Sequence, residues 1–209
     1  MMKYANYYLL ASIVLVMFLG PMAFDYGMLS LVNLEILFLG ILIGSIFLHK
    51  HNTKLFKITV VSLILILINI LIFDLNQSVF QYFLKLLIIG ITIIELFKEI
   101  LRTKIIDAHI ISGAVSIYIL IGVFWYLLYM LLLMIDPDSF TFNLQHTNKL
   151  SIDMLYFSFT TLTTLGYGDI TPTSYTAKMW AMTEAMVGVM FLALMISRLV
   201  SHFNSHLKN

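Results

Sequence analysis

Apolar residues occur along this chain in long uninterrupted runs and not in alternation with polar residues. A membrane-crossing helix needs about 20 apolar residues, and backbone inside a bilayer must be helical or closed into a barrel. Runs without a two-residue period favour helices. The pattern therefore predicts an all-α membrane protein with six transmembrane helices, at residues 5–23, 28–48, 58–74, 79–97, 112–135 and 175–199.

The composition supports a membrane protein and excludes several other classes. Of the 209 residues, 61% are hydrophobic and 11% are charged, whereas soluble domains carry about 25% charged residues. The 12 Lys and Arg nearly balance the 11 Asp and Glu, so no nucleic-acid partner is expected. There is no cysteine for a disulfide or a thiolate metal site. No nucleophile–base set or phosphate loop appears, so we expect no enzyme activity and no cofactor.

The positions of the cations give an orientation in the cell membrane. Nine of the twelve Lys and Arg fall in the segments that alternate spans place on one side: Lys3, Lys50, Lys54, Lys57, Lys98, Arg102, Lys104, Arg198 and Lys208. Cytoplasmic loops carry the excess of positive charge. Both termini are therefore expected in the cytoplasm.

The lengths of the connections divide the chain into parts. Residues 1–97 are expected to form a four-helix bundle, and residues 112–202 a second domain with a long segment between its two spans. Residues 98–111 mix charged and apolar positions, which predicts either an interfacial helix that joins the two parts or an extension of the fourth helix. Residues 203–209 are expected as a short cytoplasmic tail.

A short helix is predicted between the last two spans. Ser151 is a suitable N-cap and Asp153 an early acid, and the helix would continue to Leu162. About twelve residues give ~18 Å, which is too short to cross the ~30 Å hydrocarbon core. The helix must therefore enter the membrane and return on the same side.

The run that follows this helix, TTLGYGD at residues 163–169, is unusual in such an apolar chain. Non-helical backbone at membrane depth is tolerated where it is buried in protein or lines a wet cavity. Gly166 and Gly168 can take positive φ at little cost, which lets successive carbonyls turn to one side. With the Thr164 hydroxyl, such a row can replace the water shell of a monovalent cation.

This run resembles the signature selectivity filter of tetrameric potassium channels. The resemblance implies that K⁺ is bound by the carbonyls of Thr164, Leu165, Gly166 and Tyr167, with Gly168 completing the filter. It also implies a homotetramer, because one chain supplies one strand of the carbonyl ring. Leu165 stands where Val is most usual, which affects packing behind the filter more than ion choice.

The same resemblance identifies residues that support the filter. Tyr156 and Phe157 stand where voltage-gated relatives usually have paired tryptophans, and Thr160 stands where some bacterial relatives have Glu. Both indole donors are lost, and Tyr156 is the one that can still donate a hydrogen bond, to Asp169. We therefore expect weaker bracing of the filter and a tendency to inactivate.

The last span resembles the inner helix of that family. Gly188 falls at a frequent hinge position, although it equally permits close helix packing. Leu192 and Ile196 would then face the pore and form an apolar gate. Glu184 is an acid inside a span; it either faces the cavity or hydrogen-bonds within the protein, and the second alternative is favoured because its face is shared with the short helix.

The first four spans resemble a voltage-sensor bundle without its charges. A sensor needs several cations in its fourth helix, whereas residues 79–97 contain one, Lys85. Lys85 and Glu35 are expected at similar depth, as a buried ion pair. Gly44, four residues after Gly40, marks a close helix contact or arises by chance.

These observations predict a potassium-selective channel that conducts passively and whose partners are K⁺, membrane lipids and other copies of the chain. Two alternatives stay open. One is a weakly selective cation channel, which the intact Gly166-Tyr167-Gly168 disfavours. The other is a non-conducting membrane partner subunit.

Overall fold

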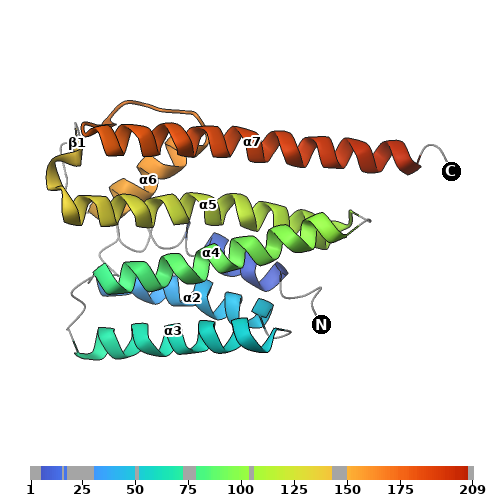
Figure 1. The fold of residues 1–209 in the computed structure, drawn as a ribbon, viewed down its shortest axis with the longest axis horizontal. Helices are drawn as coiled ribbons and strands as arrows, with labels where there is room; N and C mark the ends of the chain where they lie inside the picture. The colour runs from blue at the N-terminus through green and yellow to red at the C-terminus, as the bar shows by residue number, and fades with distance from the viewer. Residues whose placement is uncertain are drawn as a thin grey trace. The chain divides into compact units, whose positions relative to one another are not determined.

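The computed structural model describes residues 6–15, 17, 31–49, 52–72, 79–103, 106–142 and 150–206, without the side chains of 31–38, 69–72 and 202–206. It divides the chain into two compact units. The first comprises Met1–Thr103 and Asp107–Leu120, and the second Lys104–Ile106 and Ile121–Asn209. Figure 1 shows the helices of each unit.

The first unit is helical throughout its described residues. Residues 6–15 are helical, and they are followed by α2 (Leu31–His49), α3 (Thr53–Ile72), α4 (Val79–Arg102) and the first part of α5 (Ala108–Ile135). The helices α2, α3 and α4 pack against one another (Figure 1). Their shared core contains Leu42, Ile66, Leu84 and Ile88.

The boundary between the units differs from the predicted one. It falls inside α5, between Leu120 and Ile121, because the first turns of α5 pack on the bundle. His109 Nε2 lies 3.1 Å from Glu99 Oε1, and a Cβ at Gly113 would lie 3.1 Å from Asn6 Nδ2. Close contact is also present at Gly44, where a Cβ would lie 3.0 Å from Leu9 Cδ1, which supports the first of the two alternatives at this residue.

The predicted separate helix over residues 98–111 is wrong. The helix α4 continues to Arg102 and ends there, so the alternative of an extended fourth helix holds for residues 98–102 alone. A new helix then starts because Asp107 caps it: the Asp107 carboxylate accepts a hydrogen bond from Ile110 N at 3.1 Å, and its carbonyl accepts one from Ile111 N.

Three helices of the described chain are long and apolar enough to cross a membrane. They are α4, α5 and residues Tyr175–Ser201 of α7 (Tyr175–His206). Each coincides with a predicted span, and α2 and α3 are helices where two further spans are predicted. The chain is thus mostly helical.

Lys85 is buried in the first unit, with 2% of its surface exposed. Its Nζ lies 5.2 Å from the centre of the Tyr82 ring, close enough for a cation–π interaction. The side chain of Glu35 lies outside the described residues, so the Glu35–Lys85 ion pair stays a prediction.

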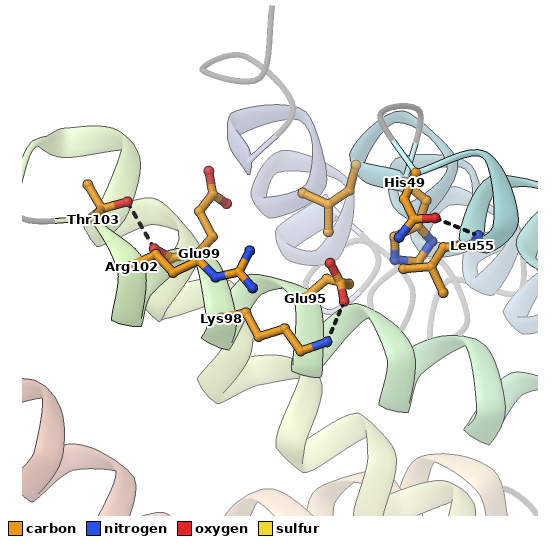
Figure 2. Close-up of a pocket in the computed structure, with 9 residues that line it drawn as sticks. His49, Leu55, Glu95, Lys98, Glu99, Arg102 and Thr103 are labelled. Carbon is orange, nitrogen blue, oxygen red and sulfur yellow. Dashed lines mark hydrogen bonds and ion pairs between the residues drawn. The ribbon is translucent and has the colours of Figure 1, made fainter.

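A pocket of about 310 Å³ lies where α2, α3 and α4 end or begin, and Figure 2 shows the side chains that line it. Lys98 pairs there with Glu95 at 2.9 Å. His49 Nδ1 lies 2.7 Å from Thr59 Oγ1, which itself donates to the Leu55 carbonyl at 2.9 Å. Because the Thr59 hydroxyl proton is used in the bond to Leu55, the bond between His49 and Thr59 requires a proton on Nδ1, and His49 is the donor.

The second unit positions a short helix between two long ones. It contains the remainder of α5, a 3₁₀ turn (Pro137–Ser139), β1 (Phe140–Phe142), α6 (Leu150–Leu162), β2 (Ile170–Pro172) and α7. The 13 residues of α6 give ~20 Å, too short to cross a bilayer. In Figure 1 α6 lies between α5 and α7.

The prediction of an entirely helical fold is wrong at two short strands. β1 pairs antiparallel with β2, with Phe140 opposite Pro172 and Phe142 opposite Ile170. The Ser139 carbonyl extends this pairing by accepting a hydrogen bond from Thr173 N at 2.8 Å. Ser174 then caps α7 through its hydroxyl, which accepts from Ala177 N at 3.2 Å.

We predict that acid weakens the first unit through His49. Burial lowers the pKa of His49 below its ordinary 6.5, although the charge of Glu95 opposes this. The folded imidazole then binds its proton more weakly than the unfolded one. Stability is therefore complete above pH 6.5 and falls as the pH drops below it.

Thermal melting of the purified protein between pH 7.5 and pH 5.5 measures this effect. His49→Asn is the matched control, because its amide can donate to Thr59 from the position of Nδ1 and does not titrate. The wild type should lose more stability than the variant over this range. Equal losses would contradict the prediction.

Candidate functional site

The C-terminal end of α6 closes with a Schellman motif. Leu165 N donates to the Thr160 carbonyl at 2.8 Å, and Thr164 N donates to the Thr161 carbonyl at 2.9 Å. Thr164 stands at the position that Gly usually takes, with φ of +59°. A β-branched residue in this conformation is strained by about 1–3 kcal/mol, and such strain concentrates at functional sites.

The backbone after this motif alternates in handedness. Positive φ recurs at Thr164, Gly166 (+53°) and Gly168 (+79°), whereas Leu165 and Tyr167 between them have negative φ. A Cβ at either glycine would meet nothing within 4 Å. The glycines are therefore required for their backbone conformation and not for space, and this alternation lets successive carbonyls face one side.

The first two amide groups after Thr164 are hydrogen-bonded, whereas the carbonyls of this segment are left as acceptors. Leu165 N and Gly166 N both donate to the Thr160 carbonyl, at 2.8 Å and 3.1 Å. Within the described chain, nothing donates a hydrogen bond to the carbonyls of residues 164–167. Residues 164–167 are exposed in the single chain, so these carbonyls are accessible acceptors.

The residues beside this segment hold Asp169 in place. Tyr156 donates the predicted hydrogen bond to Asp169 Oδ2 at 2.7 Å, and Asp169 Oδ1 accepts from Ile170 N at 3.0 Å. Burial and the bond to Asp169 raise the pKa of Tyr156 to about 12, so the phenol keeps its proton. The Tyr156 ring also stacks on Tyr167, with ring centres 6.3 Å apart.

The side chains of Phe157 and Thr160 make their contacts away from the segment. Phe157 packs edge-to-face on Tyr129 and Phe140, with ring centres 5.2 Å and 5.3 Å away, so it fixes α6 to α5 and β1. The Thr160 hydroxyl donates to the Phe157 carbonyl at 3.0 Å within α6. Thr160 serves the segment through its carbonyl, which the sequence did not indicate.

Glu184 is fully buried and bonds within the unit, as the favoured alternative predicted. Its Oε2 lies 2.6 Å from the Tyr129 hydroxyl and its Oε1 lies 2.5 Å from the Ser158 hydroxyl. The Ser158 oxygen also lies 2.7 Å from the Gly122 carbonyl. One carboxyl thus joins α7, α5 and α6.

The contact at Gly188 supports the packing alternative for this residue. A Cβ there would overlap the Leu162 carbonyl oxygen and lie 3.0 Å from Leu162 Cδ1. The last turn of α6 therefore rests directly on the backbone of α7. One and two turns further along α7, Leu192 and Ile196 are 45% and 62% exposed in the single chain.

Ser158, Tyr129 and the strand pairing were missed by sequence reasoning. Ser158 had a weak signal, as a small polar residue on an apolar helix. No sequence signal indicated the pairing of the two three-residue strands, because each strand is too short for a periodic pattern.

Comparison with known proteins supports a relationship for this second unit. A family model described as Ion channel matches residues 113–204. Two-pore potassium channel 4 of Arabidopsis thaliana is 41% identical over 61 residues, which cover 29% of this chain and 22% of the relative. Two pore potassium channel a of Oryza sativa subsp. japonica is 32% identical over 108 residues, 52% of this chain and 27% of the relative.

The matches support a potassium-channel family. The family model covers the part of the chain that carries the TLGYGD run. The chain spans about a quarter of the length of these relatives. No solved structure matches the chain at a significant level. Potassium channels are not enzymes, in agreement with the prediction from the sequence.

We predict that Tyr156→Phe loosens the segment. The substitution removes the hydrogen bond to Asp169 but keeps the ring that stacks on Tyr167. The loss is about 1 kcal/mol. Currents of the variant should decay faster than those of the wild type during prolonged opening; an unchanged decay would show that the bond does not brace the segment.

Gly188→Ala should destabilise the second unit. Helix propensity alone predicts a gain of about 1 kcal/mol from this change. Overlap with the Leu162 carbonyl predicts a loss of about 1–3 kcal/mol. The sign of the change in thermal stability shows which of the two effects is larger. The control is Ala193→Ser, which adds one atom at an exposed position of α7.

Proposed function

We propose that this chain is the subunit of a potassium-selective channel that conducts K⁺ passively across the cell membrane. The observation that carries the proposal is the backbone at residues 164–168, where alternating φ leaves four carbonyls without donors directly after a short, capped helix. Such carbonyls replace the hydration shell of K⁺. The relatives named as potassium channels support this choice of ion.

The chemistry calls for four chains. One chain supplies one carbonyl at each level of the filter, so a closed ring is a homotetramer. Thr164, Leu165, Gly166 and Tyr167 would hold the ions, and the exposed side chain of Tyr167 would pack at the contact between chains. Gly168 and Asp169 would form the outer mouth.

The remaining elements have supporting roles in this proposal. Six spans would cross the membrane with both termini in the cytoplasm, and α6 would enter it without crossing. Leu192 and Ile196 would line the inner pore as an apolar gate, with Gly188 as contact or hinge. The first unit would be a charge-poor relative of a voltage sensor, since Lys85 is the cation in the interior of α4.

Flux into liposomes tests the proposal. Purified protein in vesicles should pass K⁺ down its gradient and exclude Na⁺, and reversal potentials in mixed K⁺ and Na⁺ give the selectivity. Gly168→Ala should abolish the flux, because alanine is strained at φ of +79°. Leu165→Val, which changes the side chain and keeps the backbone, should retain it.

The results of the flux assay distinguish the proposed channel from the two alternative functions. K⁺ flux with little discrimination against Na⁺ would indicate a weakly selective cation channel. A tetramer that is folded but passes neither ion would indicate a non-conducting subunit. Flux that survives Gly168→Ala would place the conducting path elsewhere.

A further inference from the structure

The contacts around Glu184 form a series of four oxygen-bearing groups. The Tyr129 hydroxyl lies 2.6 Å from Glu184 Oε2, Glu184 Oε1 lies 2.5 Å from the Ser158 hydroxyl, and that hydroxyl lies 2.7 Å from the Gly122 carbonyl. All three separations are typical of O–H···O hydrogen bonds. Each of them therefore requires one proton between its two oxygens.

The hydroxyl groups cannot supply all three protons. Tyr129 and Ser158 each carry one, and the carbonyl of Gly122 carries none. An ionised Glu184 also carries none, which would leave one pair of oxygens facing each other with lone pairs alone. The third proton has to come from Glu184 itself.

The surroundings of the Glu184 carboxyl also favour its protonated form. Glu184 is fully buried, and within the described chain no Lys or Arg pairs with it. The group that faces it from α5 is Tyr129, which is neutral as a donor, and the group from α6 is Ser158, which does not titrate. A buried carboxylate without a cation is costly, and such groups take up a proton instead.

We propose that Glu184 is a protonated carboxylic acid whose proton lies on Oε1. The acid donates to Ser158, and Ser158 donates to the Gly122 carbonyl, so that the hydrogen bonds run in one direction from Tyr129 to Gly122. This chain of hydrogen bonds ties α7 and α5 to α6. Glu184 is thus a positioning residue for Thr160, whose carbonyl lies two residues after Ser158 and caps the segment at 164–168.

Infrared spectroscopy of the purified protein tests the protonation directly. The protein should show the C=O stretch of a protonated carboxylic acid at neutral pH, shifted by deuterium exchange. Labelling glutamate with ¹³C should shift the band further, and only four glutamates are present in the chain. The band should disappear in Glu184→Gln. A spectrum of the labelled wild type without such a band would overturn the proposal, whether or not the variant folds.

Stability of two variants tests the direction of the hydrogen bonds. Glu184→Gln reproduces the neutral acid, since its amide nitrogen can donate to Ser158 and its oxygen can accept from Tyr129. It should keep the wild-type melting temperature, whereas Glu184→Met, which does neither, should lower it. Equal losses in both variants would show that the carboxylate is the stabilising form.

Neither measurement depends on conduction. The band and the melting temperatures are read on the protein in detergent or lipid, so a chain that passes no K⁺ can still confirm the protonated acid. A chain that conducts can equally refute it. The channel proposal and this one can therefore fail separately.

Discussion

Backbone that leaves a helix needs partners for its N–H groups, and the end of α6 supplies them for the first residues that follow. The Thr160 carbonyl accepts from both Leu165 N and Gly166 N, which satisfies the donors of the segment at its start. The acceptors of residues 164–167 are then left over. The proposed binding of a cation rests on these accessible carbonyls.

The position of the segment depends on the position of α6. The other elements of the second unit contact α6 at several points along its length and fix it in place. Phe157 packs on Tyr129 and Phe140, and Ser158 bonds to Glu184. At its last turn Leu162 rests on the backbone at Gly188. Beyond the segment, Tyr156 holds Asp169, and β2 pairs with β1. Polar and apolar contacts therefore fix the segment from both ends.

What the sequence predicted well was local or compositional. The helices follow from their apolar runs, the short length of α6 follows from its flanking polar residues, and the glycines at 166 and 168 follow from the need for positive φ. The bond from Tyr156 to Asp169 was predicted from the resemblance to potassium channels, in which Tyr156 stands at the position of an indole donor. The inward turn of Glu184 followed from the face that it shares with α6.

What the sequence did not predict depends on contacts between distant residues. The pairing of β1 with β2 joins segments about 30 residues apart, with three residues in each strand. Ser158 gains its importance from Glu184 and Gly122, which lie on two other helices. The start of α5 at Asp107 depends on a single capping carboxylate in a charged stretch that also suits a continuous helix.

In the proposed channel, the charge content of α4 would limit the contribution of the first unit to gating. One elementary charge that crosses the whole membrane potential gains about 2.3 kcal/mol per 100 mV. Lys85 is one charge, and it is buried beside Tyr82, so leaving its site would also cost the interactions it makes there. In the proposed channel, a membrane potential would therefore do little work on α4. The bundle packs on the first turns of α5 through Asn6, Gly113 and the bond between Glu99 and His109, so in this proposal it would serve primarily as a structural support for that helix.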